Sequence, residues 1–259
     1  MEWELRLLGC WQLLGNGLPV AVGIRQERLI TALALMGQRP RSYLAGLLWP
    51  ESGEQQAAGS LRSTVFKVRH QLPGLLSDSL EPIGLGPTVT VDVRRFRERA
   101  ELVRAGAAPE PDFEELLFGA ELLPGWYDDW VIFEQERLRA LRVATLEATA
   151  RQHLARDEAD AAVVAARQAA AIEPLRESAQ ALVIRAQVQA GDTAGAYRTL
   201  EEFRSRLRDE LGLEPSDRLK AALTGGSFDV LGLPAPLPAR QPSMLNAHRQ
   251  LVEEARASG

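Results

Sequence analysis

Cysteine is almost absent from this sequence, since Cys10 is the only one in 259 residues. A single cysteine excludes an intramolecular disulfide and any multi-cysteine metal cluster, and it is consistent with a reducing compartment. No run of eighteen apolar residues occurs, and the first eight residues alternate apolar and charged side chains, unlike a signal peptide. We therefore expect a cytoplasmic protein that does not enter a membrane.

Residue sets that carry catalysis or hold a cofactor are also scarce. The histidines His70, His153 and His248 lie far apart, and none has a metal-ligand spacing such as HExxH. Adjacent acidic residues would point about 100° apart on a helix, which suits acid-base catalysis poorly. The only lysines, Lys67 and Lys220, follow no glycine-rich phosphate loop. The sequence predicts no enzyme, no ATPase and no metal or other cofactor.

Charge is divided unevenly along the chain. Residues 1–95 carry ten Lys or Arg and eight Asp or Glu, a net charge of +2, whereas residues 96–259 have a net charge of −7. No Asp or Glu occurs between Glu54 and Asp78. An anionic partner such as nucleic acid can therefore approach this stretch without repulsion.

The acid-free stretch has the pattern of an amphipathic helix over residues 55–72. Its apolar residues recur at spacings of four, three and four, which places them on one stripe that should be buried. The opposite face carries hydrogen-bond donors and almost no acceptors. This face comprises Gln56, Arg62, Ser63, Phe66, Lys67 and His70, with Arg69 at its edge. Such a face is typical either of a solubilising helix surface or of a nucleic-acid recognition helix.

The residues before this helix predict a small sheet and two further helices. Alternating apolar residues in 3–22 indicate a short antiparallel hairpin unit. Helical spacing over 24–36 ends at Gly37, in a C-cap position. A second short helix is expected over 43–48, with Ser42 as its N-cap.

The residues after it complete a winged-helix order. Glycines and an alternating apolar run between residues 75 and 93 predict a β-hairpin. Strands, three helices and a terminal hairpin describe a winged helix-turn-helix with an extra N-terminal sheet, in which the third helix enters the major groove of DNA. This context favours the recognition helix over the solubilising surface.

From Asp92 onward helical spacing dominates, and an internal repeat appears. Asp92 is expected to cap a helix, and a long helix begins near Asp129. The segment starting at Arg156 returns thirty-five residues later at Gly191, and a Glu-Pro pair closes each unit. A helix pair with a period of about 34 residues is the tetratricopeptide pattern. The predicted fold is therefore mainly α with small β elements.

Three regions are expected on this basis. A winged-helix DNA-binding domain occupies 1–95, and a tetratricopeptide-like all-α domain occupies 96–225. Residues 226–259 begin with a linker, since 233–242 contains four prolines, and 243–255 has the pattern of one amphipathic helix.

Five blocks in this order connect the chain with a known family. They are Leu7-Leu8-Gly9, Leu47-Leu48-Trp49-Pro50, Ala58-Gly59-Ser60-Leu61-Arg62, Glu173-Pro174-Leu175-Arg176-Glu177 and Asp209-Glu210-Leu211-Gly212-Leu213-Glu214-Pro215. Over residues 2 to about 224 the chain resembles the antibiotic regulatory protein family of actinobacterial transcriptional activators. The second part of these proteins is the bacterial transcriptional activation domain.

The resemblance implies sequence-specific binding to double-stranded promoter DNA, by two protomers side by side on direct repeats, and recruitment of RNA polymerase through its subunits. The residues that would contact DNA are Gln56, Ser60, Arg62, Ser63, Lys67, Arg69 and His70. The loop that related winged helices present to the polymerase would include Trp49, Glu51, Ser52 and Glu54.

The wing departs from the family pattern, because Gly84-Leu85-Gly86-Pro87 has no aromatic or basic residue. Arg94 and Arg95, just after it, are expected to contact phosphate instead. Phe66 is expected to pack beneath the wing, with contact to a thymine methyl group as the alternative. The plain wing also favours a different function, that of an adaptor whose helical repeats bind other proteins and whose winged helix has lost DNA.

Overall fold

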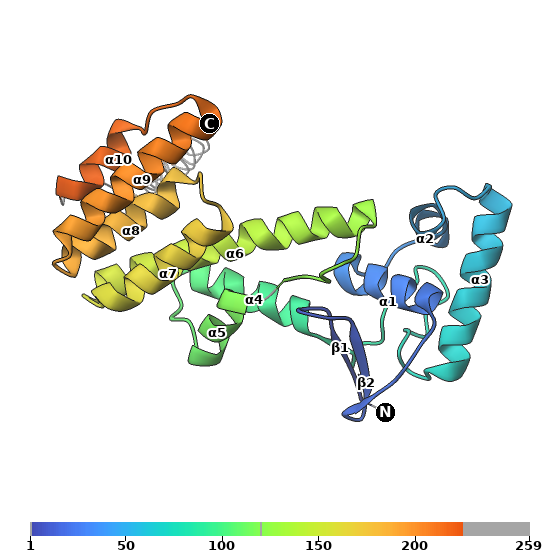
Figure 1. The fold of residues 1–259 in the computed structure, drawn as a ribbon. Coiled ribbons are helices and arrows are strands. Elements are labelled where there is room, and N and C mark those ends of the chain that lie inside the picture. The colour runs from blue at the N-terminus through green and yellow to red at the C-terminus, as the bar shows by residue number, and fades with distance from the viewer. Residues whose placement is uncertain (1, 120, 225–259) are drawn as a thin grey trace, which may run out of the picture. The chain divides into compact units, whose positions relative to one another are not determined.

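The structure is a computed structural model that describes residues 2–119 and 121–224, which lie within one compact unit. This part of the chain is mainly helical, with a four-stranded sheet near its N-terminus (Figure 1). None of its helices is long and apolar enough to cross a lipid bilayer. The predicted linker and amphipathic helix in 226–259 lie outside the described residues.

The sheet has the strand order β3-β2-β1-β4. Strand β1 (Trp3–Arg6) pairs antiparallel with β2 (Gln12–Gly15), which pairs antiparallel with β3 (Leu18–Pro19). Alternate side chains of β1 are buried, as the sequence pattern requires of a strand with one face on a core. Strand β4 (Thr90–Val91) lies on the other side of β1 and runs parallel to it.

Three helices follow the N-terminal strands. They are α1 (Ile24–Met36), α2 (Arg41–Leu48) and α3 (Glu54–Gln71). Helix α1 has the predicted bounds and ends at Gly37, whose φ of 77° a residue with a side chain rarely adopts. The predicted Ser42 cap is wrong, because α2 begins earlier with Pro40 at its N-cap.

The predicted hairpin over residues 75–93 is wrong in its pairing. Only an isolated antiparallel bridge, Leu76 to Leu85, joins the two sides of this segment. The alternating run instead supplies β4, because its buried residues Val89 and Val91 fill the core beside β1. A bridged loop therefore stands where the sequence predicts a two-stranded wing.

Asp92 joins the sheet to the helices that follow. It is the first residue of α4 rather than its cap, and its carboxylate accepts hydrogen bonds from the backbone N–H groups of Leu7 (2.8 Å), Leu8 (2.9 Å) and Val93 (2.6 Å). The end of β1 is thereby fixed to the start of α4.

Helices form the rest of the described chain, and α6 to α9 pack in sequence order, each against the next. Small buried side chains on α7, such as Ala162 and Ala166, allow close packing. The bounds are α4 (Asp92–Arg104), α5 (Pro111–Gly119), α6 (Asp129–Ala155), α7 (Ala159–Ile172), α8 (Glu177–Gln189), α9 (Thr193–Leu211) and α10 (Asp217–Ala221).

The main hydrophobic core crosses the boundary expected at residue 95. It includes Trp3 of β1, Leu33 of α1, Phe96 of α4 and Val131 of α6, all of them buried. A second cluster lies among the last helices, around Phe203. The division of the chain at residue 95 stays a prediction, while the packing shows that α4 connects the two parts through a continuous core.

Candidate nucleic-acid interface

Helix α3 packs through one side only. Its apolar stripe, with Leu61, Val65 and Val68 buried, faces the core, and α1 and α2 both pack against it (Figure 1). The opposite face is open to solvent. Its exposed residues are Gln56, Arg62, Ser63, Phe66, Lys67 and His70, the set that helical periodicity places there, while Ser60 is half-buried.

The two central cations of this face are not engaged within the protein. Arg62 and Lys67 are exposed and have no hydrogen-bond or ion-pair partner among the described residues. A guanidinium and an ammonium in this state lose no internal bond when they bind an anion. Arg62 and Lys67 are therefore the strongest candidates for contact with nucleic acid.

Phe66 does not pack beneath the wing. Its side chain is 70% exposed and stacks in parallel on the ring of His70, with centroids 6.1 Å apart. The prediction fails because the segment after α3 turns toward the chain between α1 and α2, where Ile83 and Arg39 exchange backbone hydrogen bonds. Phe66 thus presents an uncovered apolar surface beside Arg62 and Lys67.

Arg69 holds the loop that follows α3. Its guanidinium donates to the carbonyl oxygens of Ser77 (3.1 Å) and Ser79 (2.7 Å). These bonds engage an Nη group of Arg69, a residue that the sequence analysis expects to contact DNA. Whether Arg69 also contacts DNA stays a prediction, but its contacts in the structure position the bridged loop.

Arg94 and Arg95 differ from one another. Arg94 donates to the carbonyl oxygens of Leu33 (3.0 Å) and Ala34 (3.1 Å) near the C-terminal end of α1, and burial lowers the pKa of its guanidinium. Cations at this end of a helix satisfy its last carbonyl groups. Arg95 is exposed, without a partner in the described part of the chain. Phosphate contact by either residue stays a prediction.

The loop expected to meet the polymerase lies between α2 and α3. Trp49 ends α2 and is half-buried against the core, and the backbone N–H of Ser52 donates to the Trp49 carbonyl at 3.1 Å. Glu51 and Glu54 are exposed. The turn thus directs two carboxylates outward, and contact with the polymerase remains a prediction.

Gln26 is a positioning residue that sequence reasoning missed. Its buried side chain donates from Nε2 to Gln71 of α3 at 2.8 Å and accepts from the backbone N–H of Gly23 at 3.0 Å. The start of α1 is thereby joined to the end of α3. A glutamine three residues after a helix cap is the available sequence signal.

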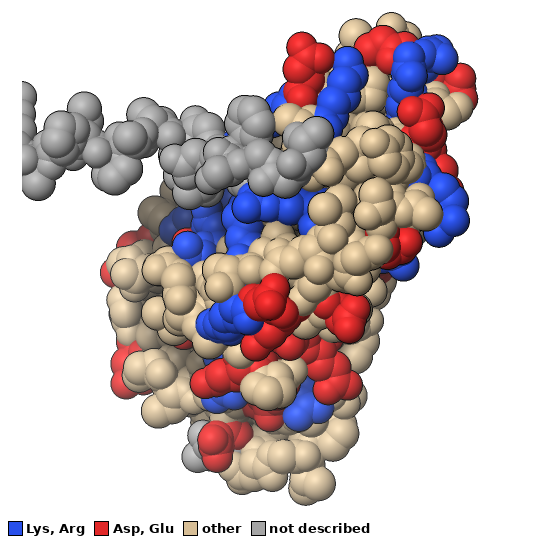
Figure 2. All heavy atoms as spheres, turned by 90° about the vertical axis from the view of Figure 1, so that its left-hand side faces the viewer, with Lys and Arg blue, Asp and Glu red and all other residues tan. Residues whose placement is uncertain are grey.

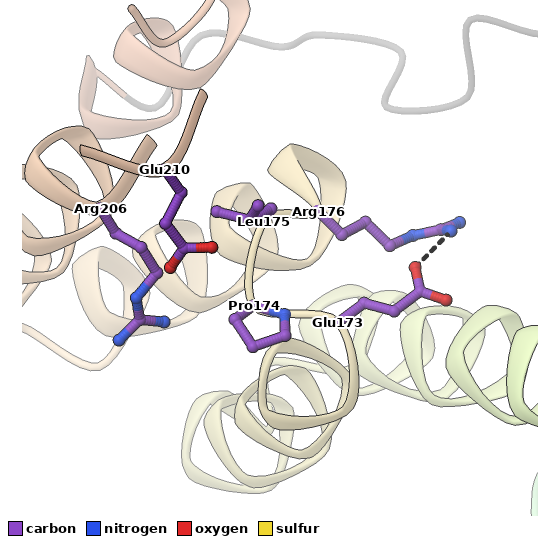
Figure 3. A pocket seen from close by; sticks show the side chains of 6 residues that line it. All are labelled: Glu173, Pro174, Leu175, Arg176, Arg206 and Glu210. Atoms are coloured by element: carbon purple, nitrogen blue, oxygen red, sulfur yellow. Dashed lines mark hydrogen bonds and ion pairs between the residues drawn. The ribbon is translucent and has the colours of Figure 1, made fainter. Parts of the chain in front are cut away.

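The helical repeats contain a cavity of about 660 Å³ that competes as a binding site. In Figure 3, Arg206 and Glu210 of α9 lie across it from the turn between α7 and α8, where Arg176 pairs with Glu173 at 3.1 Å. Its lining thus carries two acidic and two basic side chains, and Figure 2 shows acidic and basic side chains interspersed over this end of the repeats. Such a surface does not attract a polyanion as the acid-free face of α3 does.

No group of three or more His, Cys, Asp or Glu side chains in the described ranges has an arrangement that would hold a metal ion. The lack of a cofactor and of enzymatic activity stays a prediction from the sequence.

Comparisons with known proteins bear on the fold and on the second half of the chain. Residues 91–224 match the family model described as the bacterial transcriptional activator domain. The fold is similar to that of Mycobacterium tuberculosis EmbR in complex with a low-affinity phosphopeptide, with a TM-score of 0.69 and 22% sequence identity. The match covers 86% of this chain but 64% of that one, so this chain spans less than two thirds of its length. The comparison with curated proteins returned no match.

The structural likeness, at this identity, concerns the fold. It confirms the predicted architecture, an N-terminal winged helix-turn-helix followed by tetratricopeptide-like helices.

Proposed function

Because this chain belongs to the family of the bacterial transcriptional activator domain, and is thus a transcriptional regulator, we propose that it binds promoter DNA through α3 and recruits RNA polymerase. Membership also confirms the resemblance to the antibiotic regulatory proteins. Two protomers on direct repeats would place two copies of α3 in successive major grooves.

One observation carries the proposal. The outward face of α3 holds Arg62 and Lys67 with no internal partner, in a stretch without acidic residues, while its inner stripe is buried. An α-helix fits the major groove of B-DNA, and the phosphates attract cations that are free to pair. The sequence places these residues on the helix, and packing leaves them accessible.

The side chains suit different parts of a duplex. Arg62 can donate two hydrogen bonds to guanine, while Lys67 suits a phosphate. Gln56, Ser63 and His70 add donors to base edges or phosphates. The exposure of Phe66 supports its contact with a thymine methyl group, which becomes the preferred role.

The test is a salt titration of binding to fragments of the protein's own genome. Arg62→Ala should cost about 1–3 kcal/mol on the preferred fragment and relax base preference, whereas Lys67→Ala should weaken all fragments alike and lower the salt slope by about one unit. Arg167→Ala is the matched control, because Arg167 of α7 is also exposed and unpartnered in the described structure. If no fragment is retained above background, or the Arg62→Ala, Lys67→Ala double variant binds unchanged, α3 is not the recognition helix.

Polymerase recruitment is tested separately through the loop between α2 and α3. A Glu51→Ala, Glu54→Ala variant should bind the promoter at least as tightly as the unaltered chain, because the loss of two negative charges does not weaken the attraction to phosphate, but it should transcribe the promoter less in a purified system. Unchanged transcription would show that the carboxylates of this loop do not contact the polymerase.

A further inference from the structure

The cations of residues 1–95 fall into two groups in the structure. Most are engaged within the protein: Arg6 with Glu4, Arg28 with Asp128, Arg39 over the ring of Tyr43, Arg41 with Glu81, and Arg69 and Arg94 with backbone carbonyls. Those left exposed without a partner among the described residues are Arg25, Arg62, Lys67 and Arg95. Arg25 is the one among them that the sequence pattern did not assign to DNA.

Arg25 lies beside the recognition face although it belongs to another helix. It is the second residue of α1, and together with Lys67 of α3 it lines a groove of about 310 Å³. The lining residues are Gly23, Ile24, Arg25, Gln26, Ser63, Thr64 and Lys67, with no Asp or Glu among them. The groove therefore has a cation from each helix and no carboxylate of its own to neutralise them.

The relative position of the two helices at this groove is fixed. Gln26, next to Arg25, donates to Gln71 at 2.8 Å, and Gln71 is one turn of α3 beyond Lys67. Arg25 and Lys67 are thus held at one groove without pairing to any protein carboxylate. Two like charges gathered in this way repel each other, and an anion between them relieves the repulsion.

We propose that this groove is a phosphate-contact site of the DNA interface, in which Arg25 of α1 and Lys67 of α3 hold the sugar-phosphate backbone beside the base pairs that α3 contacts. The inference rests on the proposed DNA binding and adds a second helix to the contact surface. The hydroxyl of Ser63, also in the groove, supplies a neutral donor to the same backbone.

The role assigned to Arg25 is positioning on DNA rather than base recognition. Phosphate contacts fix the orientation of a protein on the duplex and carry no direct sequence information. A sugar-phosphate backbone held at the start of α1 sets the angle at which α3 enters the major groove of the duplex, because Gln26 links α1 to α3. Arg25 should therefore strengthen binding to preferred and unrelated duplexes by the same factor.

The experiment measures binding of the full chain to its preferred fragment and to an unrelated duplex of equal length, over a range of salt concentrations. Arg25→Ala should weaken both by one common factor and lower the salt slope by about 0.9 for the lost phosphate. Arg25→Lys should keep the slope, since the charge remains, and Arg25→Glu should lower affinity further. If Arg25 and Lys67 hold the same phosphate, the double alanine variant should lose less than the product of the two single losses.

The possible results separate this inference from the function on which it rests. If the unaltered chain retains no duplex, DNA binding itself is wrong. Suppose instead that the unaltered chain binds DNA and that Arg62→Ala weakens this binding. If Arg25→Ala then has the same affinity and salt slope as Arg167→Ala, only the assignment of the groove as a phosphate-contact site is wrong. If Arg25→Ala weakens the preferred fragment alone, Arg25 contacts a base and the phosphate assignment fails. Equal thermal midpoints of the variants show that folding is not the cause.

Discussion

The guanidinium of Arg69 donates a 2.7 Å hydrogen bond to the backbone carbonyl oxygen of Ser79. The donor lies near the end of α3 and the acceptor in the loop that replaces the predicted wing. This bond and the second one, to Ser77, predict that Arg69→Ala releases the loop. We expect a loss of about 1–2 kcal/mol in the free energy of unfolding, since a charged donor strengthens both bonds.

Hydrogen exchange at the amides of Ser77 and Ile83, which bond to backbone carbonyls in this region, should become faster in the Arg69→Ala variant. Arg69→Lys is the informative control. It keeps the charge, but its side chain is shorter than that of arginine and lacks the planar guanidinium whose Nη group donates to both carbonyls, so it should also loosen the loop. A lysine variant as rigid as the unaltered chain would contradict the positioning role.

The bond between Gln26 and Gln71 predicts a second stability effect. Gln26→Ala removes a buried side chain that bonds both to α3 and to the N-cap of α1, and should lower the free energy of unfolding by about 1–2 kcal/mol. Urea denaturation measures the loss. Gln55→Ala, at an exposed position of α3, should stay within about 0.5 kcal/mol of the unaltered chain. Equal stability of the Gln26→Ala and Gln55→Ala variants would show that the bond between Gln26 and Gln71 does not stabilise the fold.

Local periodicity was enough to place the recognition helix. The stripe of Leu61, Val65 and Val68 fixes which side of α3 is buried, so the exposed set on its other side follows from a spacing of 3.6 residues. The bounds of α1 follow for the same reason, with glycine at its end. These features depend on residues close together in the chain.

Features that depend on distant partners were not predictable in this way. Strand β4 pairs with β1 across more than eighty residues, and no local pattern distinguishes this from a hairpin. Arg69 and Arg62 both lie in the stretch without acidic residues, yet Arg69 is bonded to carbonyls and Arg62 has no partner among the described residues. Which cations remain available to a partner is decided by tertiary contacts.

Asp92 predicts a pH dependence of stability. Burial raises the pKa of its carboxyl group above the usual 3.8. The hydrogen bonds from the N–H groups of Leu7, Leu8 and Val93 favour the charged form and oppose this rise, but burial has the larger effect. The folded chain then holds this proton to a higher pH than the unfolded chain does. Its contribution to stability is complete below the unfolded pKa and is lost as the pH rises through the folded pKa.

The measurement compares the free energy of unfolding of the unaltered chain with that of Asp92→Asn, which does not titrate. When one free energy of unfolding is subtracted from the other, the contributions of the other titrating groups cancel. We expect the advantage of the unaltered chain to shrink as the pH rises above about 4. An advantage that grows with pH would mean that the three N–H bonds outweigh burial and lower the pKa instead.

Arg97 of α4 connects α1 with α6. It donates to the carbonyl oxygen of Leu35 at 3.2 Å and to the carboxylate of Glu134 at 2.6 Å, and Glu134 is 5% exposed. Removal of one partner from a buried ion pair leaves the other charge uncompensated. Arg97→Ala should therefore lower the free energy of unfolding by about 2–4 kcal/mol, toward the lower value because Arg137 still pairs with Glu134 at 2.9 Å.

A second substitution separates lost charge pairing from lost packing. In the Arg97→Ala background, the carboxylate of Glu134 keeps only the exposed Arg137 as its ion-pair partner. Glu134→Gln removes this carboxylate and should restore part of the stability, as a double-mutant cycle in urea would measure. Arg104→Ala breaks an exposed pair with Glu101 and should cost about 1 kcal/mol or less. If Glu134→Gln restores nothing, the aliphatic part of Arg97 and its bond to Leu35, rather than the buried charge, hold α4 between α1 and α6.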